Sequence, residues 1–193
     1  AWVSSDIDPL TRFDDDDSRM RFVAGLARKN VELGTGGPFG AAIFDGDGRL
    51  VSVGVNRVMP QNCSLAHAEI MAFLTAQQRL QRFRLNEDGG RYVLVTSAQP
   101  CCQCYGASFW AGIDEMHIGA RAEDVMSLTE FDEGPLPADW IGDVVFVCDQ
   151  DDGVPLMVQL FKQHHDLFAG LGVEVPRRFV GQDNGRTGHQ RTC

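Results

Sequence analysis

The stretch YVLVTSAQPCCQC, residues 92–104, joins a buried strand to the start of a helix, and it decides how the surrounding chain folds. Tyr92–Thr96 is an apolar, β-branched run of the kind found in buried strands. Pro100 then predicts a helix that begins at about Cys101, because proline is tolerated in a first helical turn. Cys101 and Cys104 therefore share a first turn, where the helix dipole favours the thiolate form.

A second short motif, Ala66-His67-Ala68-Glu69, opens another segment of helical character, with 33 residues between His67 and Cys101. One imidazole and two thiolates supply three of the four ligands of a tetrahedral zinc site, which leaves the fourth position open to water. The carboxylate of Glu69 is placed to take a proton from that water. We therefore predict a catalytic Zn²⁺ held by His67, Cys101 and Cys104, with Glu69 as the catalytic base.

The remaining patterns alternate between strands and helices. Predicted strands cover residues 40–44, 50–55, 92–96, 115–118 and 144–148, and a D-G turn at 45–48 joins the first two as a hairpin. Predicted helices cover residues 18–31, 66–81, 101–111, 124–128 and 154–169, the first of them capped by the acidic run 14–17. This order predicts an α/β fold with three layers, α/β/α, around a mixed central sheet of about five strands.

Length and composition limit the organisation of the chain. At 193 residues, a single domain over residues 1–175 is expected. Residues 176–193 are polar, rich in Gly and Arg and without periodicity, so we interpret them as a C-terminal tail. The six cysteines do not form a disulfide framework, which favours a cytoplasmic location. No apolar run approaches the roughly 18 residues of a membrane span, and no secretory signal is evident.

The charge balance bears on the class of partner. The net charge is −10 and the isoelectric point is near 4.8. Proteins that grip nucleic acid usually present a basic stripe. The nearest approach to one is formed by Arg79, Arg82, Arg84 and Arg91, which is better interpreted as positive charge near the end of a helix. The composition favours a small-molecule substrate and argues against nucleic acid or membrane partners.

With H-x-E and P-C-x-x-C in this order, the chain resembles the cytidine-deaminase-like superfamily, and within it the small zinc-dependent guanine deaminases. The segment GGPFGA at 36–41, Asn56, the Phe109-Trp110 pair and the sequence FDE at 131–133 extend the resemblance. It covers about residues 22–110 and continues more faintly to 133. It implies hydrolytic deamination of guanine to xanthine and ammonia in purine metabolism, carried out by a homodimer whose contact could include Phe109-Trp110.

The resemblance also implies roles for individual residues. Phe39 would stack on the base and Asn56 would hydrogen-bond its edge. Glu69 would carry a proton from water to a ring nitrogen. Glu133 would be the second proton carrier, with Asp132 as its nearest competitor.

Several of these residues have a plainer interpretation. Phe39 could simply pack in the core, and the side chain of Asn56 could form an Asx-type turn after its strand. Glu133 could be an ordinary loop acid. Cys63 could close a structural zinc site with four protein ligands. Gln99 stands where many relatives have Glu, which leaves the contacts around the metal and the substrate edge open.

Two other side chains near these motifs are interpreted as structural. Cys102, between the two ligands, is expected to be a small packed side chain pointing away from them. His117 is expected to be a satisfied strand histidine. In the related enzymes a C-terminal tail closes over the active site, sometimes that of a neighbouring subunit, and residues 176–193 could do the same.

Two alternative functions remain open at this point. The first is deamination of another amino-heterocycle, such as an aminotriazine, cytosine or adenosine in tRNA. The second is a non-catalytic zinc-binding module that binds a partner through its long C-terminal region.

Overall fold

The computed structural model describes residues 2, 8, 11–128 and 144–146 of the chain. Five strands form one sheet in the order β2-β1-β3-β4-β5. Their bounds are β1 Gly40–Asp45, β2 Leu50–Val55, β3 Tyr92–Thr96, β4 Glu115–Ile118 and β5 Val144–Phe146. β1 pairs antiparallel with β2 and β3, whereas β3, β4 and β5 run parallel. The mixed sheet of about five strands predicted from the sequence is confirmed.

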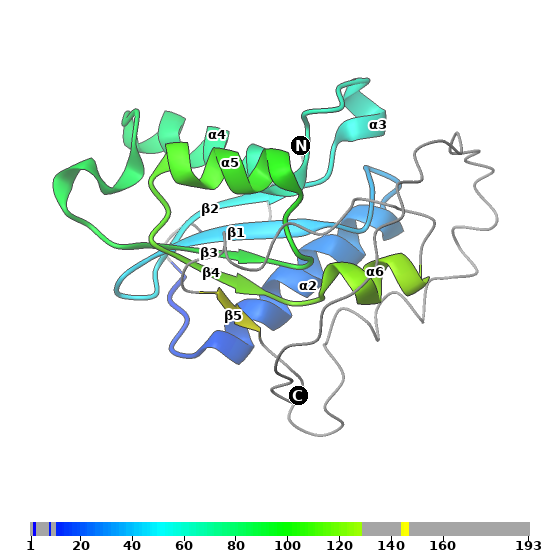
Figure 1. Ribbon diagram of the computed structural model, residues 1–193, viewed down its shortest axis with the longest axis horizontal. Coiled ribbons are helices and arrows are strands. Elements are labelled where there is room, and N and C mark those ends of the chain that lie inside the picture. The colour runs from blue at the N-terminus through cyan, green and yellow to red at the C-terminus, as the bar shows by residue number, and fades with distance from the viewer. Residues whose placement is uncertain (1, 3–7, 9–10, 129–143, 147–193) are drawn as a thin grey trace, which may run out of the picture.

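The helices lie on both faces of this sheet, which gives three layers. The helices of the described residues include α2 Asp16–Glu32, α3 Val58–Gln61, α4 Ala68–Leu80, α5 Cys102–Ala111, α6 Ala122–Leu128 and a 3-10 turn at Leu85–Asp88. Figure 1 shows α4 and α5 side by side over one face, with α2 and α6 on the other. The predicted α/β/α arrangement is therefore confirmed.

Some predictions fall on parts of the chain that are not described. These are the helix at 154–169, the end of the strand at 147–148, and the boundary between a domain ending at 175 and a tail at 176–193. Within the described helices, none combines the length and the apolar character needed to cross a bilayer.

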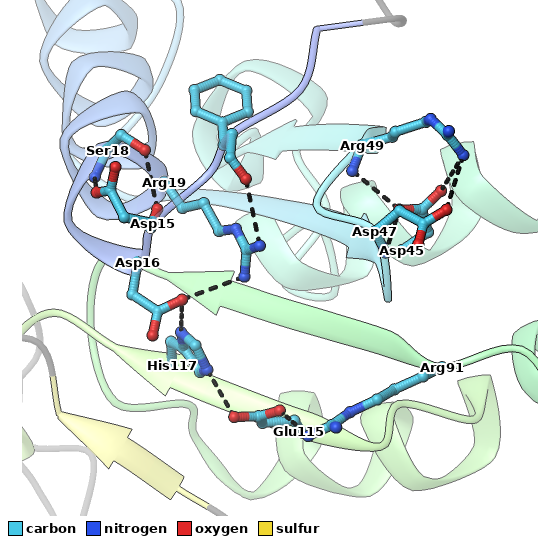
Figure 2. Close-up of polar contacts among 11 residues, drawn as sticks. Asp15, Asp16, Ser18, Arg19, Asp45, Asp47, Arg49, Arg91, Glu115 and His117 are labelled. Carbon is cyan, nitrogen blue, oxygen red and sulfur yellow. Dashed lines mark hydrogen bonds and ion pairs between the residues drawn. The ribbon is translucent and has the colours of Figure 1, made fainter.

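Helix α2 begins where the acidic run predicts. The side chain of Asp15, the N-cap, accepts a 2.7 Å hydrogen bond from the backbone N–H of Ser18 (Figure 2). Asp16 and Asp17 occupy the first turn. Carboxylates at this end satisfy free N–H groups and complement the helix dipole. At the other end, Gly34 takes φ +62°, a conformation that glycine adopts without strain.

Both layers of helices rest on glycines of the β1–β2 hairpin. A Cβ at Gly54 of β2 would lie 2.0 Å from the backbone O of Ala68 in α4. A Cβ at Gly40 of β1 would lie 2.7 Å from the backbone O of Val23 in α2. Because α4 faces β2 with alanines, including the buried Ala72, its backbone packs directly on the strand. This contact fixes the height of α4 above the sheet.

Candidate metal centre and active site

The side chains of three residues meet at the N-terminal ends of α4 and α5: His67, Cys101 and Cys104. Their ligand atoms all lie within 4.8 Å of one another. His67 Nδ1 is 3.6 Å from Cys101 Sγ and 3.5 Å from Cys104 Sγ. Zinc bonded at about 2.3 Å to sulfur and about 2.0 Å to nitrogen, with tetrahedral angles, holds two such donors about 3.5 Å apart. The two distances from His67 Nδ1 to the sulfurs therefore match those around a bound zinc ion.

Helix α4 begins two residues later than predicted, at Ala68, and α5 begins one residue later, at Cys102. His67 is the N-cap of α4 and Cys101 is the N-cap of α5, both with extended backbone. Pro100 therefore lies before the cap and not inside the helix, because an extended Cys101 separates it from the first helical residue. An N-cap side chain points back over the end of its helix, which lets ligands from two separate helices converge.

The positions of the other cysteines bear on the number of ligands. Cys63 does not belong to the ligand group, so the group formed by the described residues contributes three donors and not four. Three protein ligands with one open position is the arrangement of catalytic zinc sites. Cys102 is exposed, which corrects the expectation that it packs as a small buried side chain. It is the first residue of α5 and lies outside the ligand group, whereas Cys101 before it and Cys104 two residues after it belong to that group.

The two cysteine ligands differ in how readily they ionise. The hydrogen bond with Cys104, assisted by His67, lowers the pKa of Cys101 to about 3. The same contact raises the pKa of Cys104, as do its burial and the negative charge of Glu69. A divalent cation stabilises both thiolates at once, so its binding releases a proton from this pair.

Glu69 lies in the first turn of α4, directly beside the ligand group. Its side chain is only 7% exposed. Oε1 accepts a 2.9 Å hydrogen bond from Thr96 Oγ1 at the end of β3, and Oε2 lies 3.3 Å from Cys104 Sγ. Burial raises the pKa of Glu69 above its ordinary value, against the lowering effect of hydrogen bonds such as that from Thr96. A raised pKa makes the carboxylate a stronger base, which favours proton transfer from water.

Asn56 and Phe39 lie together at the end of the β1–β2 pair. The backbone N–H of Asn56 donates a 3.0 Å hydrogen bond to the carbonyl of Phe39. The ring of Phe39 is partly buried and packs against the core cluster that includes Ala68 of α4. Asn56 Oδ1 accepts a 3.3 Å hydrogen bond from the backbone N–H of Val58. The plainer contacts of both residues, core packing and an Asx-type turn, are therefore present.

Other sequence expectations have different outcomes. Glu133 and its competitor Asp132 lie outside the described residues. Gln99 accepts a 3.1 Å hydrogen bond from the backbone N–H of Ala122 through its side-chain oxygen. This contact ties the segment before the cysteines to the first turn of α6. The glutamine therefore has a structural partner that the sequence does not indicate.

Two contributing residues escaped the sequence analysis. Thr96 occupies an ordinary strand position, and its partner Glu69 lies 27 residues away. The two-residue periodicity of β3 places Thr96 on the same face as Leu94, toward α4, and that periodicity was the available signal. Asn30 falls on the apolar face of α2, where a polar residue has to find hydrogen-bond partners.

A cavity of about 220 Å³ lies apart from the metal ligands, toward α2. His117 lines it and is nearly fully buried, with Nε2 at 2.9 Å from Glu115 and Nδ1 at 3.4 Å from Asp16 (Figure 2). Glu115 also pairs with Arg91. Nε2 has a hydrogen-bond partner in Glu115, but Nδ1 is buried and has no hydrogen-bond partner among the described residues, so the expectation of a satisfied strand histidine holds for one ring nitrogen only. None of the cavity-lining residues belongs to the ligand group.

Comparison with known proteins places the chain in a class. Residues 14–120 match the family model described as the cytidine and deoxycytidylate deaminase zinc-binding region. The chain belongs to this zinc-binding family, in agreement with the fold and the zinc predicted from the sequence.

Among the individual proteins to which the chain is similar are guanine deaminases. The chain is 41% identical over 99 residues to a guanine deaminase of Bacillus subtilis, which covers 51% of this chain and 60% of that protein. It is similar to the solved guanine deaminase of Nitrosomonas europaea, with 34% identity, a TM-score of 0.75, and coverage of 86% of this chain and 92% of that one. A mutant protein crystallised with 8-azaguanine gives 34% identity and a TM-score of 0.76, with 86% and 93% covered. The chain spans 53–62% of the length of the curated relatives it matches.

Proposed function

We propose that this protein is a zinc-dependent hydrolase that deaminates a free purine base, guanine, to xanthine and ammonia. The observation that carries the proposal is the buried carboxylate of Glu69, held by Thr96 beside the three-residue ligand group. A structural zinc site has no need of a nearly buried carboxylate next to its ligands. The similarity to guanine deaminases and to a protein that binds 8-azaguanine supports guanine as the substrate.

In this proposal His67, Cys101 and Cys104 hold the metal. When bound, zinc acts as a Lewis acid that makes water a stronger acid and polarises the substrate. Two thiolates and a neutral imidazole give a site of almost no net charge, so the acidifying effect is weaker than with three histidines. The neighbouring ends of α4 and α5 and the carboxylate of Glu69 compensate for this difference.

Glu69 performs the proton transfers that the hydrolysis of a C–N bond requires. It accepts a proton from the attacking water and delivers it to a ring nitrogen of the base. Its raised pKa suits both steps, because the carboxyl must gain and then lose the proton in one turnover. The amine leaves as ammonia after a second protonation, for which we propose Glu133 as the carrier, with Asp132 as its competitor.

Phe39 and Asn56 are proposed to bind the base. The ring of Phe39 offers an apolar face for stacking, and the amide of Asn56 can both donate to and accept from the base edge. The backbone hydrogen bond between these two residues supports a shared role, because it holds them at one end of the sheet. Their packing and turn contacts are compatible with this role, since each leaves part of the side chain for a ligand.

A substrate panel tests the proposal. Purified, zinc-loaded protein is incubated with guanine, adenine, cytosine, their nucleosides, aminotriazines and tRNA, and released ammonia is measured. We expect guanine to give the highest kcat/KM. If another heterocycle gives the highest kcat/KM, that compound and not guanine is the substrate. If none of them is deaminated, the protein is a non-catalytic zinc-binding module.

The Glu69→Gln variant separates catalysis from metal binding. We expect kcat to fall by about a thousandfold while zinc content stays at one per chain. Glu123→Gln, which changes an exposed carboxylate on α6, is the matched control and should retain full activity. Wild-type turnover by the zinc-loaded Glu69→Gln variant would contradict the proposed mechanism.

We further propose a cytoplasmic homodimer. Phe109 and Trp110 at the end of α5 are 63% and 68% exposed, and apolar aromatic side chains of this size are favoured at subunit contacts. Cys63, Cys101, Cys102 and Cys104 are all free thiols, which suits a reducing compartment. Light scattering after size-exclusion chromatography tests the dimer, and Trp110→Lys should shift it to a monomer.

A further inference from the structure

Asn30 is a fully buried polar residue on a helix face that is otherwise apolar. Its relative exposure is 0%, and its neighbours on the same face of α2 include Val23, Leu26 and Ala27. A buried amide is costly unless each of its polar atoms has a partner. Asn30 is therefore retained at a position where an apolar side chain would be the simpler choice, and its contacts indicate why.

The amide of Asn30 joins two segments that are far apart in the sequence. Nδ2 donates hydrogen bonds of 2.8 Å to the carbonyl of Gly37 and 2.9 Å to the carbonyl of Asn56. Oδ1 accepts a 2.8 Å hydrogen bond from Thr35 Oγ1. One side chain thus satisfies all of its polar atoms by connecting the loop after α2 to the end of β2.

The loop after α2 and the end of β2 are in such close contact that a side chain at Gly36 would not fit between them. A Cβ at Gly36 would lie 1.8 Å from the backbone O of Asn56 and 2.7 Å from Nδ2 of Asn30. A Cβ at Gly37 would lie 3.2 Å from Oδ1 of Asn56. The loop backbone therefore lies against both the main chain and the side-chain amide of Asn56. Any shift of the loop relative to α2 moves Asn56 with it.

Phe39 belongs to the same connection. It follows Gly37 by two residues, and its carbonyl accepts the hydrogen bond from the N–H of Asn56. The two residues proposed to bind the base are thus held by each other and, through Gly37 and Asn56, by Asn30.

We infer that Asn30 is a positioning residue for the base pocket, which acts through Asn56 and Phe39 and does not touch the substrate. This inference rests on the proposed function, in which Asn56 and Phe39 bind the base. Loss of its two donors would let the loop and the end of β2 separate, and the hydrogen-bonding edge of Asn56 would lose its orientation. The ligand group at α4 and α5 should keep its geometry, because the hydrogen bonds of the Asn30 amide go to Thr35, Gly37 and Asn56.

A double-mutant cycle tests this inference in the zinc-loaded protein. We expect Asn30→Leu, which keeps the volume but removes the amide, to raise KM for guanine about tenfold with kcat changed less than about threefold. In an Asn56→Ala background the same substitution should raise KM by less than about twofold, because the residue through which it acts is absent. Zinc content should stay at one per chain throughout.

Matched controls separate positioning from general destabilisation. Val23→Ala alters a buried residue two turns earlier on α2, and should lower the thermal midpoint while leaving KM unchanged. Thr35→Val removes the hydroxyl that donates to Asn30 and should raise KM by about threefold, whereas Thr35→Ser should match the wild type. Comparing Thr35→Val with Thr35→Ser tests the role of Asn30 even if the Asn30→Leu variant does not fold.

The outcomes are distinguishable. A wild-type protein that deaminates no heterocycle overturns the proposed function and this inference together. An active wild type in which Asn30→Leu and Asn56→Ala have independent, multiplicative effects on KM overturns the role of Asn30 alone. Equal KM effects of Asn30→Leu and Val23→Ala, or of Thr35→Val and Thr35→Ser, would likewise overturn it.

Discussion

Thr96 Oγ1 donates a 2.9 Å hydrogen bond to Glu69 Oε1, so the end of the central strand β3 fixes the orientation of the carboxylate beside the metal site. Both side chains are buried. We expect Thr96→Val to lower kcat by about tenfold, because the carboxylate loses its only side-chain hydroxyl donor among the described residues. Steady-state kinetics should show an unchanged KM, and elemental analysis should show an unchanged zinc content.

The matched variant for this position is Thr96→Ser, which keeps the hydroxyl. It should retain most of the wild-type kcat. Equal losses in the Val and Ser variants would mean that Thr96 matters for packing and not for the orientation of Glu69.

Cysteines that are adjacent in the sequence should differ sharply in their effect on the metal. Cys101→Ser should lower zinc content well below one per chain, because a serine hydroxyl is a poor zinc ligand compared with a thiolate. Cys102→Ser, one residue further on, alters an exposed side chain outside the ligand group and should keep its zinc. Elemental analysis of both purified variants tests this, and loss of zinc from Cys102→Ser would contradict the assignment.

Gly54 should be intolerant of even one methyl group. A Cβ there would lie 2.0 Å from the backbone of α4, so Gly54→Ala must lift the helix. We expect a loss of about 1–3 kcal/mol in the free energy of unfolding, together with weaker zinc binding. Gly25→Ala is the control, because a Cβ at this helical glycine meets nothing within 4 Å and should stabilise the fold slightly. Urea denaturation measures both.

Glu115 should make stability depend on pH in the acid range. The hydrogen bond with His117, together with Arg91, lowers the pKa of Glu115 in the folded protein. A group whose pKa is lowered by folding stabilises the fold above its unfolded pKa, and this contribution is lost as the pH falls through the folded pKa. Glu115→Gln should therefore be less stable than the wild type at pH 7, by on the order of 1 kcal/mol.

The difference between Glu115→Gln and the wild type should shrink as the solution is made acid. Unfolding midpoints measured between neutral and strongly acid pH test this. A difference that stays constant over the whole range would show that the charge of Glu115 is not responsible.

The metal ligands could be predicted because each motif is short and local. His67 and Glu69 share one helix end, and Cys101 and Cys104 share another, so their spacing alone indicates which side chains face the same point. The fold could be predicted for a similar reason, since strands such as Tyr92–Thr96 carry their periodicity within a few residues. The start of α4 was displaced by two residues and that of α5 by one, because cap conformation depends on the backbone and not on residue type.

What the sequence could not supply are contacts between residues that are distant along the chain. The partner of Thr96 is 27 residues away, and Asn30 reaches Asn56 across 26 residues. A threonine in a strand and an asparagine in a helix have no pattern that names such partners. The exposure of Cys102 was missed because helix position, and not the apolar character of the thiol, decides which way that side chain points.

Because α4 packs directly on Gly54, the proposed base pocket has a rigid side, formed by α4, and a more adjustable side, formed by the loop that carries Phe39. The backbone that carries Glu69 moves only if the helix rises from the sheet, whereas Phe39 sits on a loop that is held by hydrogen bonds with Asn30, Asn56 and Arg57. Redesign toward a differently shaped heterocycle should therefore begin with the loop and its hydrogen bonds. The metal ligands and Glu69 can then be left unchanged while the substrate preference is altered.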